Sequence, residues 1–465
     1  MRTPITFRER SRQVLRQPAQ TAALLHTSDV LCAARLAYAR SSADWTAVQT
    51  AARAIRLRTL DNLAGHLEAL EGVIAARGGK VIWARDGHAA AQYIAEIAQA
   101  RRVTQAVHSQ MPLVLEIDLA TALRRVNVRL QPTNVGDYLA DLAGHRPAHP
   151  LASVANRHID DVVKTVQDQL QVPVPMHAPA IVDVVRTRVR QAVLHSGLSI
   201  HGADFAIAET GTLVTLDAQA DVRLATAHVP VQIVLLGIEQ VVPTVDDWLT
   251  LQRAVLGSAY GQTHLAHVDL LSGSSHPADD TEFHLILLDN GRSTLLASPA
   301  REVLTCIRCG ACQTACPISR RVGSEPYAWS YPGPVGAVIA AWLLPPAYRD
   351  AVAASTLCGA CRAVCPVDID LPTLLAQARQ PRVFQGARRP PPGLRQIVSR
   401  FHTPAGRASL ARWLTAGRLL AGPHAQRPWL APWLLRWTSS RDLPPLPDTP
   451  FHLRWAQRAV RQADD

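Results

Sequence analysis

Apolar residues recur at helical spacing through residues 44–76, which predicts that this part of the chain is helical. The pattern ends at Gly78 and Gly79, and the apolar run at 80–84 predicts a strand. Asp86 is a suitable N-cap for a helix that reaches residue 102, and short apolar runs at 104–107 and 126–130 predict two further strands. Strands that alternate with helices of ten or more residues indicate an α/β fold with a parallel sheet.

After a polar, proline-containing stretch at residues 145–176, with one helical segment at 162–170, the same alternation resumes. Helices are predicted at 182–195 and 246–257, and buried strands at 231–236 and 283–288. The segments beginning at Gly202 and Glu209 are rich in turn residues and lie at predicted strand ends, where open α/β sheets usually bind ligands. Neither segment matches a phosphate-binding glycine loop, so we predict no nucleotide site there.

Seven of the eight cysteines fall in two short runs. The first reads Cys306-Ile-Arg-Cys309-Gly-Ala-Cys312-Gln-Thr-Ala-Cys316-Pro317, and the second reads Cys358-Gly-Ala-Cys361-Arg-Ala-Val-Cys365-Pro366. The first run has the spacing of bacterial iron–sulfur sites, in which three close thiolates bind one cluster and the fourth binds another. The spacing therefore predicts two four-iron clusters.

In such sites the fourth cysteine of each run binds the cluster of the other run, and this rule assigns the ligands of each cluster. Cluster 1 would take Cys306, Cys309, Cys312 and Cys365, and cluster 2 would take Cys316, Cys358 and Cys361. Cluster 2 then lacks a fourth thiolate, because the position three residues before Cys358 is Ser355. We expect a labile four-iron cluster whose remaining iron is held by Ser355 or by an exogenous group, and which forms a three-iron cluster under oxidising conditions.

Other uses of the cysteines fit the pattern less well. A structural zinc site usually uses two separated pairs of ligands, and a disulfide framework belongs to short secreted chains. The remaining cysteine, Cys32, is predicted to fill apolar space.

Two regions flank the cysteines. The insert at 322–346 is rich in aromatic residues and is expected to shield the clusters from water, which would tune their potentials. Residues 381–465 hold fourteen arginines against four acids and five of the ten tryptophans, with one amphipathic helix predicted at 409–420. Docking of this basic region on an acidic partner subunit is favoured over binding at a membrane surface, and no nucleic-acid-binding module is seen.

The chain carries a net charge of +11, most of it in that last region. No apolar run approaches the length of about 20 residues that a membrane-spanning helix needs. The N-terminus has charged residues where a secretory signal would have its apolar core. We therefore expect a cytoplasmic protein, and a peripheral position at the inner face of the membrane stays open.

The evidence for functional residues in the first half of the chain is weaker than that for the cysteines, and we assign no catalytic residue. Glu209 could contact a substrate, although hydrogen bonding to the amides of its own turn is the favoured interpretation. Arg292 could bind a carboxylate with two hydrogen bonds or pair with Asp289. Three histidines could be considered as a base but are interpreted as structural: His201, His228 and His264.

The sequence resembles the lactate utilisation protein B family, the iron–sulfur subunit of a bacterial L-lactate utilisation complex. The resemblance covers most of the chain from about residue 45 and lies in the segments that begin at Gly202, Leu288, Cys306, Tyr331, Leu357, Arg441 and Phe451. It implies a lactate-utilisation domain, with a fold similar to ribose-phosphate isomerases and CoA transferases, followed by a helical two-cluster ferredoxin-type domain. It also implies a complex with a CCG-type cysteine-rich subunit and a small subunit that shares the lactate-utilisation fold.

Two segments depart from the family pattern: residues 217–223, which replace an Asn-Glu-Gly-Asn-type turn, and residues 108–111, which lack the expected lysines. We divide the chain into a helical segment at 1–75, the α/β lactate-utilisation domain at 76–295, the two-cluster domain at 296–380 and the basic region at 381–465.

The function expected from this organisation is electron transfer through two [4Fe-4S] clusters during L-lactate oxidation, with a possible acceptor at the membrane surface. Two alternatives stay open. One is the iron–sulfur subunit of a glycolate oxidase-like or succinate dehydrogenase-like enzyme, and the other is a redox-sensing iron–sulfur protein without turnover.

Overall fold

The computed structural model describes residues 6–216, 219–265, 267–273 and 281–380, together with Ser399, Thr403, Ala405, Gly406, Ser409 and Trp455. The chain divides into two compact units, Met1–Gly386 and Ala387–Asp465. The helix predicted at 409–420 and most of the basic region lie outside the described residues.

Six parallel strands form the central sheet of the first unit, in the order β1-β10-β7-β4-β2-β3. Their bounds are β1 Lys80–Ala84, β2 Gln105–His108, β3 Arg129–Pro132, β4 Leu198–Gly202, β7 Val231–Gly237 and β10 Glu282–Leu288. A second sheet has the order β8-β5-β6-β9, with β5 Phe205–Ile207, β6 Thr212–Thr215, β8 Val241–Val242 and β9 Asp269–Leu271. The parallel α/β architecture is as predicted.

Helices cover both faces of the six-stranded sheet, which explains the almost continuous apolar runs of its central strands. Along β7, Ile233 and Leu235 pack against α5 (Gly87–Ala100) and α7 (Leu119–Arg125). Val234 and Leu236 point to the other face and pack against α4 (Leu63–Ala76). On that second face, α8 (Val135–Leu142), α9 (Ile159–Leu170) and α10 (Ala178–Leu194) form a further cluster.

Local signals explain most of the element bounds. Asp86 caps α5 through its side chain, which accepts a hydrogen bond from the amide of Ala89, as predicted. The strand predicted at 126–130 begins only at Arg129, because Asn127 takes a left-handed conformation (φ 60°) and residues 126–128 form the turn after α7. The remaining helices of the sheet domain are α6 Pro112–Glu116, α11 Asp221–His228, α12 Val245–Ala259 and the 3₁₀ turn η1 Ile238–Gln240.

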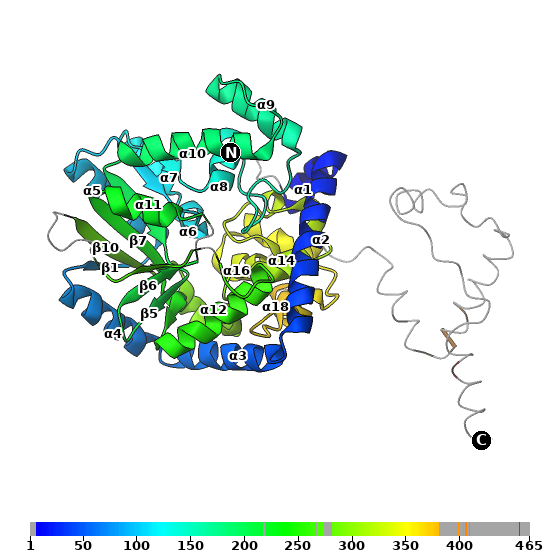
Figure 1. The fold of residues 1–465 in the computed structure, drawn as a ribbon. Coiled ribbons are helices and arrows are strands. Elements are labelled where there is room, and N and C mark those ends of the chain that lie inside the picture. Colours follow the sequence, from blue (N-terminus) through cyan, green and yellow to red (C-terminus); the bar gives the residue numbers. More distant parts are fainter. Residues whose placement is uncertain are drawn as a thin grey trace. The chain divides into compact units, whose positions relative to one another are not determined.

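Short helices build the cysteine-containing region. They are α13 Arg292–Leu296, η2 Arg301–Thr305, α14 Ala311–Ala315, α15 Ser319–Val322, η3 Glu325–Tyr327, α16 Gly333–Leu343, η4 Pro346–Ala354, α17 Ala360–Ala363 and α18 Leu371–Ala378. Figure 1 shows them beside the sheet domain, with helix α2 (Pro18–Ser41, dark blue) running along them. The first helices, α1 (Phe7–Leu15) and α2, pack on this region, whereas α3 (Trp45–Asp61) packs on α12 and η2.

In the described part of the chain, no helix has both the length and the apolar character that crossing a bilayer requires.

Candidate iron–sulfur centre

Of the seven cysteines in the two runs, four line one cavity of about 100 Å³: Cys306, Cys309, Cys312 and Cys365. The thiol of Cys312 interacts electrostatically with the thiols of the other three. Cys361 interacts in the same way with Cys316 and Cys358. The fold thus brings together members of both runs, while the assignment of ligands to each cluster stays a prediction.

Backbone conformation explains why the cysteines can face inward. Gly310 and Gly359, which precede α14 and α17, have φ values of +70° and +83°, a region that residues with a side chain rarely adopt. Backbone amides donate hydrogen bonds to these sulfurs, among them that of Arg308 to Sγ of Cys306 and that of Ile369 to Sγ of Cys365, each at 3.4 Å. Such amide bonds stabilise thiolate ligands and tune the potential of an iron–sulfur cluster.

The donor set of the cavity fits an iron–sulfur cluster. Burial, followed by the neighbouring thiols, raises the pKa of Cys309 to about 12, and burial also raises the pKa of Cys365 to about 12. Four crowded thiols in an apolar cavity are costly to ionise unless a cationic centre binds them, and metal coordination supplies that charge. Within the described ranges, no three His, Cys, Asp or Glu side chains lie close enough to hold a single metal ion.

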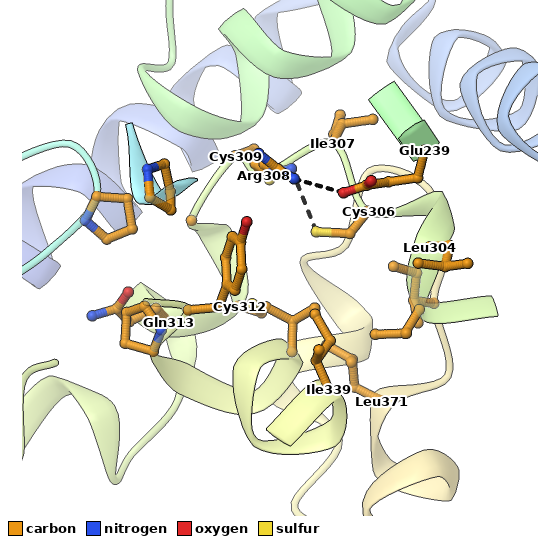
Figure 2. Close-up of a pocket in the computed structure, with 18 of the residues that line it drawn as sticks. Glu239, Leu304, Cys306, Ile307, Arg308, Cys309, Cys312, Gln313, Ile339 and Leu371 are labelled. Atoms are coloured by element: carbon orange, nitrogen blue, oxygen red, sulfur yellow. Dashed lines mark hydrogen bonds and ion pairs between the residues drawn. The ribbon is translucent and has the colours of Figure 1, made fainter. Parts of the chain in front are cut away.

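Apolar and aromatic side chains enclose these thiols, as predicted for the insert at 322–346. Tyr331, Val335 and Ile339 come from that insert, and Leu304 and Leu371 complete the wall. Figure 2 shows Leu304, Ile339 and Leu371 lining this cavity with the cysteines. Low polarity around the thiols limits solvent access, which is one of the determinants of cluster potential.

A buried ion-pair network borders the cavity. Arg308, which lies between Cys306 and Cys309, donates from Nη2 to Oε1 of Glu239 at 2.6 Å (Figure 2), and its guanidinium stacks over the ring of Tyr331 at 5.2 Å. The other carboxylate oxygen of Glu239 accepts from Nε of Arg292 at 2.5 Å. Sequence reasoning identified neither Glu239 nor Arg308, although the position of Arg308 inside the first cysteine run was a usable signal.

Arg292 binds a second carboxylate with two hydrogen bonds, Nη1 and Nη2 to the two oxygens of Glu116 at 2.8 and 3.0 Å. The hydroxyl of Tyr331 donates to the same carboxylate at 2.6 Å. Burial alone would raise the pKa of Glu116, but Arg292 and these hydrogen bonds lower it to about 2. Of the two roles considered for Arg292, carboxylate binding is therefore the observed one, and the carboxylate belongs to the chain itself.

A third arginine, Arg56, is 1% exposed and donates to backbone carbonyls, among them those of Glu239, Val241 and Leu304. Burial lowers its pKa to about 10, so it stays protonated at neutral pH. The thiol of Cys306 acts in the opposite direction to burial and raises the pKa of Arg56 electrostatically. This network beside the cavity therefore contains three positive charges, on Arg56, Arg292 and Arg308, and two negative charges, on Glu116 and Glu239. Its net charge is +1.

In the second group of cysteines, Cys316 and Cys361 are buried, whereas Cys358 lies at the surface. Cys358 is exposed, and the amide of Ala360 is the largest factor that lowers the pKa of its thiol. Ser355, the predicted cap of cluster 2, is half-buried, and its hydroxyl accepts a hydrogen bond from the amide of Leu357 at 3.2 Å. Its backbone carbonyl accepts from Arg379, which also binds the carbonyl of Val352.

The other candidates have structural positions. Glu209 is exposed, and its carboxylate accepts from the amide of Val245, the first residue of α12, at 2.7 Å. The favoured interpretation, a buried acid bonded to the amides of its own turn, was therefore wrong. His228 ends α11 and is exposed, His264 is exposed beside Thr263, and His201 is 1% exposed within β4.

The prediction for Cys32 was wrong. This residue is half-buried, and its sulfur donates to the backbone carbonyl of Thr314 at 3.5 Å and accepts from Arg35 at 3.4 Å. Because α2 packs on α14, Cys32 contacts the helix that carries Cys312 and does not fill an apolar core.

Comparison with known families identifies both halves of this arrangement. Residues 67–288 match the LUD domain, and residues 302–369 match the 4Fe-4S dicluster domain. Among solved structures, a DUF162 family protein from Deinococcus radiodurans is 16% identical, covers 49% of this chain and 98% of its own, and has a TM-score of 0.29. The predicted likeness to ribose-phosphate isomerases and CoA transferases stays a prediction.

Curated relatives match along nearly the whole chain. Lactate utilization protein B of Lysinibacillus sphaericus is 32% identical over 453 residues, 94% of each chain. That of Anoxybacillus flavithermus is 32% identical over 391 residues, 83% of this chain and 82% of the relative. An uncharacterized electron transport protein of Escherichia coli, YkgF, is 30% identical over 384 residues, 82% of this chain and 81% of its own. With its LUD domain, its dicluster domain and this near-complete coverage, the chain belongs to the lactate utilization protein B family.

Proposed function

We propose that this chain is the iron–sulfur electron-transfer subunit of a complex that oxidises L-lactate. The proposal is supported above all by the enclosed set of four thiols, which lies beside a second set of three and in a domain that matches dicluster proteins. Lactate as the substrate is taken from the names of the relatives, and the L enantiomer from the family resemblance.

The residues that would hold the groups are those of the two predicted sets. Cluster 1 would be held by Cys306, Cys309, Cys312 and Cys365, and cluster 2 by Cys316, Cys358 and Cys361 with Ser355 or an exogenous group at the fourth iron. Iron–sulfur clusters accept and release single electrons at potentials that their surroundings set.

The chain's own residues would act on these groups in two ways. The apolar wall around the first set excludes water, and the surplus positive charge of Arg56, Arg292 and Arg308 favours the electron-rich state of cluster 1. Cys358 is exposed, so cluster 2 would lie near the surface where another protein can approach. We infer that cluster 2 faces the partner subunits, for which a CCG-type subunit and a small LUD-domain subunit are proposed.

The test is dye-coupled oxidation of L-lactate by the co-expressed complex, with the native chain and with Cys309→Ala. Loss of at least 90% of the activity in the variant is expected, because removing one of four thiolates disrupts cluster 1. Unchanged activity with a variant that has lost half of its iron would contradict the proposed relay. Activity towards glycolate or succinate but not lactate would show that the substrate assignment is wrong, while the proposed electron-transfer role would stand.

A further inference from the structure

A second, larger cavity opens at the carboxyl edge of the six-stranded sheet, with a volume of about 470 Å³. The last residues of three neighbouring parallel strands line it: His108 of β2, Pro132 of β3 and Gly202 of β4. The carboxyl edge of a parallel sheet is where α/β domains usually bind ligands. Its size is within the range of about 300 to 1,000 Å³ typical of sites for small organic molecules.

This cavity shares a wall with the cavity of the first cysteine set. Six residues line both: Pro112, Pro150, Arg308, Trp329, Ser330 and Pro332. A molecule bound at the sheet edge would therefore be separated from the thiols of cluster 1 by one layer of side chains. Since Arg308 lies between Cys306 and Cys309 in the chain, the same side chain would face both groups.

Polar and apolar side chains share the lining of this cavity, and two of the polar ones, Ser330 and Asp137, are buried. Ser330 is 8% exposed, and its hydroxyl has no hydrogen-bond partner among the described residues. Asp137, 9% exposed, accepts hydrogen bonds from Ser153 and, at 3.4 Å, from Gln110. Burial raises the pKa of Asp137 to about 6. A buried hydroxyl without a partner is costly, so a ligand that bonds to Ser330 would be stabilised.

Apolar and aromatic side chains form part of the walls, among them Met111, Leu151, Leu216, Tyr260 and Trp329. These surfaces suit a flat ring system better than a polyphosphate. Three aspartates (Asp137, Asp141 and Asp204) against two arginines (Arg146 and Arg308) leave the cavity without the surplus positive charge that a polyphosphate would need. A three-carbon acid is far smaller than the space available.

We propose that this cavity binds a flat conjugated redox ring, a flavin or quinone ring, with a ring carbonyl edge toward Arg308 and Ser330. The proposal rests on the proposed function, because oxidation of a 2-hydroxy acid releases two electrons whereas each cluster takes one. Cations near the ring edge stabilise the reduced, electron-rich ring. The site supplies that cation through Arg308, which also faces cluster 1.

A two-electron ring of this kind balances the electrons between the 2-hydroxy acid and the one-electron clusters. A 2-hydroxy acid loses a hydride from C2 and the proton of its hydroxyl to become a 2-oxo acid. The ring takes the hydride and one proton, and returns two electrons one at a time to the clusters while it releases two protons. The acids and histidines that line the cavity and are available to exchange those protons are Asp137, Asp141, Asp204, His108 and His145.

The experiment measures ring binding directly on the purified, oxygen-protected full chain. Riboflavin and FMN are titrated by quenching of flavin fluorescence, and menadione by equilibrium dialysis, with L-lactate in a separate arm. The variant Leu151→Trp fills the cavity, and Leu249→Trp, on the exposed side of α12, is the matched control. Iron content and absorption spectra confirm that each variant retains its clusters.

Micromolar binding of either ring class is expected, at least tenfold weaker in Leu151→Trp and unchanged in Leu249→Trp. The arm that binds identifies flavin or quinone as the source. Binding of neither ring, equal binding in both variants, or binding of L-lactate alone would overturn the proposal. Ring binding without lactate oxidation by the complex would overturn the proposed function and leave this site standing.

Discussion

Arg308 and Glu239 form an ion pair at the border of the cluster cavity, with 2.6 Å between Nη2 and Oε1. The arginine comes from the first cysteine run and the glutamate from the 3₁₀ turn after β7, so the pair joins the cysteine-containing region to the sheet domain. It also gives the first set of thiols a fixed positive neighbour.

Removing the charge in Arg308→Gln is expected to lower the reduction potential of cluster 1. A unit charge at about 8 Å and an effective dielectric of 20 contributes roughly 2 kcal/mol, and a one-electron change of that size corresponds to about 90 mV. Partial compensation by Glu239 makes a decrease of several tens of millivolts the expected result. The measurement is an EPR-monitored redox titration.

Two controls define this test. Arg308→Lys keeps the charge and should keep most of the potential, whereas Arg125→Gln, at an exposed position in α7, should change nothing. An unchanged potential in Arg308→Gln, with both clusters intact, would show that the network has only a structural role.

Replacing Arg292 with methionine should destabilise the chain strongly, because it leaves the carboxylates of Glu116 and Glu239 buried without their shared cation. Breaking a buried pair of this kind costs about 3–5 kcal/mol. Urea unfolding followed by circular dichroism measures the loss. Arg301→Met, which removes an exposed pair with Asp61, should cost less than about 1 kcal/mol, and equal effects of the two variants would contradict this account.

Stability should fall as the pH decreases from about 6.5 towards 4, and His284 should contribute to that fall. Burial, with the nearby Lys80 and Arg101, lowers its folded pKa to about 4, against about 6.5 for the unfolded chain. In that window the unfolded state binds more protons, so stability rises with pH. Tyr93 and Glu282 also form hydrogen bonds with the two ring nitrogens of His284.

Comparing His284→Gln with the native chain isolates this contribution. The variant should lose about 2 kcal/mol less than the native chain between pH 7 and pH 5. Thermal or urea unfolding at both pH values measures the difference, with the exposed His228→Gln as control. An identical pH dependence in all three chains would show that His284 titrates normally.

Two glycines should respond to alanine in opposite directions. A Cβ on Gly336 would lie 1.6 Å from the backbone oxygen of Tyr331, so Gly336→Ala must displace the start of α16 and the cover of cluster 1. A Cβ on Gly72, inside α4, meets nothing within 4 Å. Gly72→Ala should therefore stabilise by about 0.5–1 kcal/mol, while Gly336→Ala should lower the melting temperature and speed loss of iron. Similar behaviour of the two variants would contradict the close packing at Tyr331.

The open fourth position proposed for cluster 2 predicts how Ser355 variants behave. Because the hydroxyl of Ser355 already bonds to the amide of Leu357, Ser355→Ala should leave cluster 2 as labile as before. Ser355→Cys would restore a fourth thiolate and should reduce the three-iron EPR signal after mild oxidation at least severalfold. Rapid loss of cluster 2 in Ser355→Ala would instead show that the serine is a ligand.

Periodicity and caps predicted the sheet domain well because its central strands β4, β7 and β10 are buried and helices such as α5 begin at clear caps, as Asp86 illustrates. It failed at residues 126–128, where a left-handed Asn127 replaces the expected strand. The cysteines were recognisable from spacing alone, since ligand spacing is local in sequence.

The network around them was not recognisable, because it depends on contacts between distant residues. Glu116, Glu239 and Arg308 come from three separate segments and are joined only by the fold. Cys32 was misjudged for the same reason, since the packing of α2 on α14 is not encoded in any local pattern.

The most direct test of the central claim is iron and acid-labile sulfide analysis with EPR on oxygen-protected protein, for the native chain and for Cys309→Ala. The native chain should contain roughly eight irons and eight sulfides, somewhat fewer irons if cluster 2 has lost one, and Cys309→Ala should retain about half with the signal of cluster 2. A native chain that carries one cluster, or only zinc, would contradict the account.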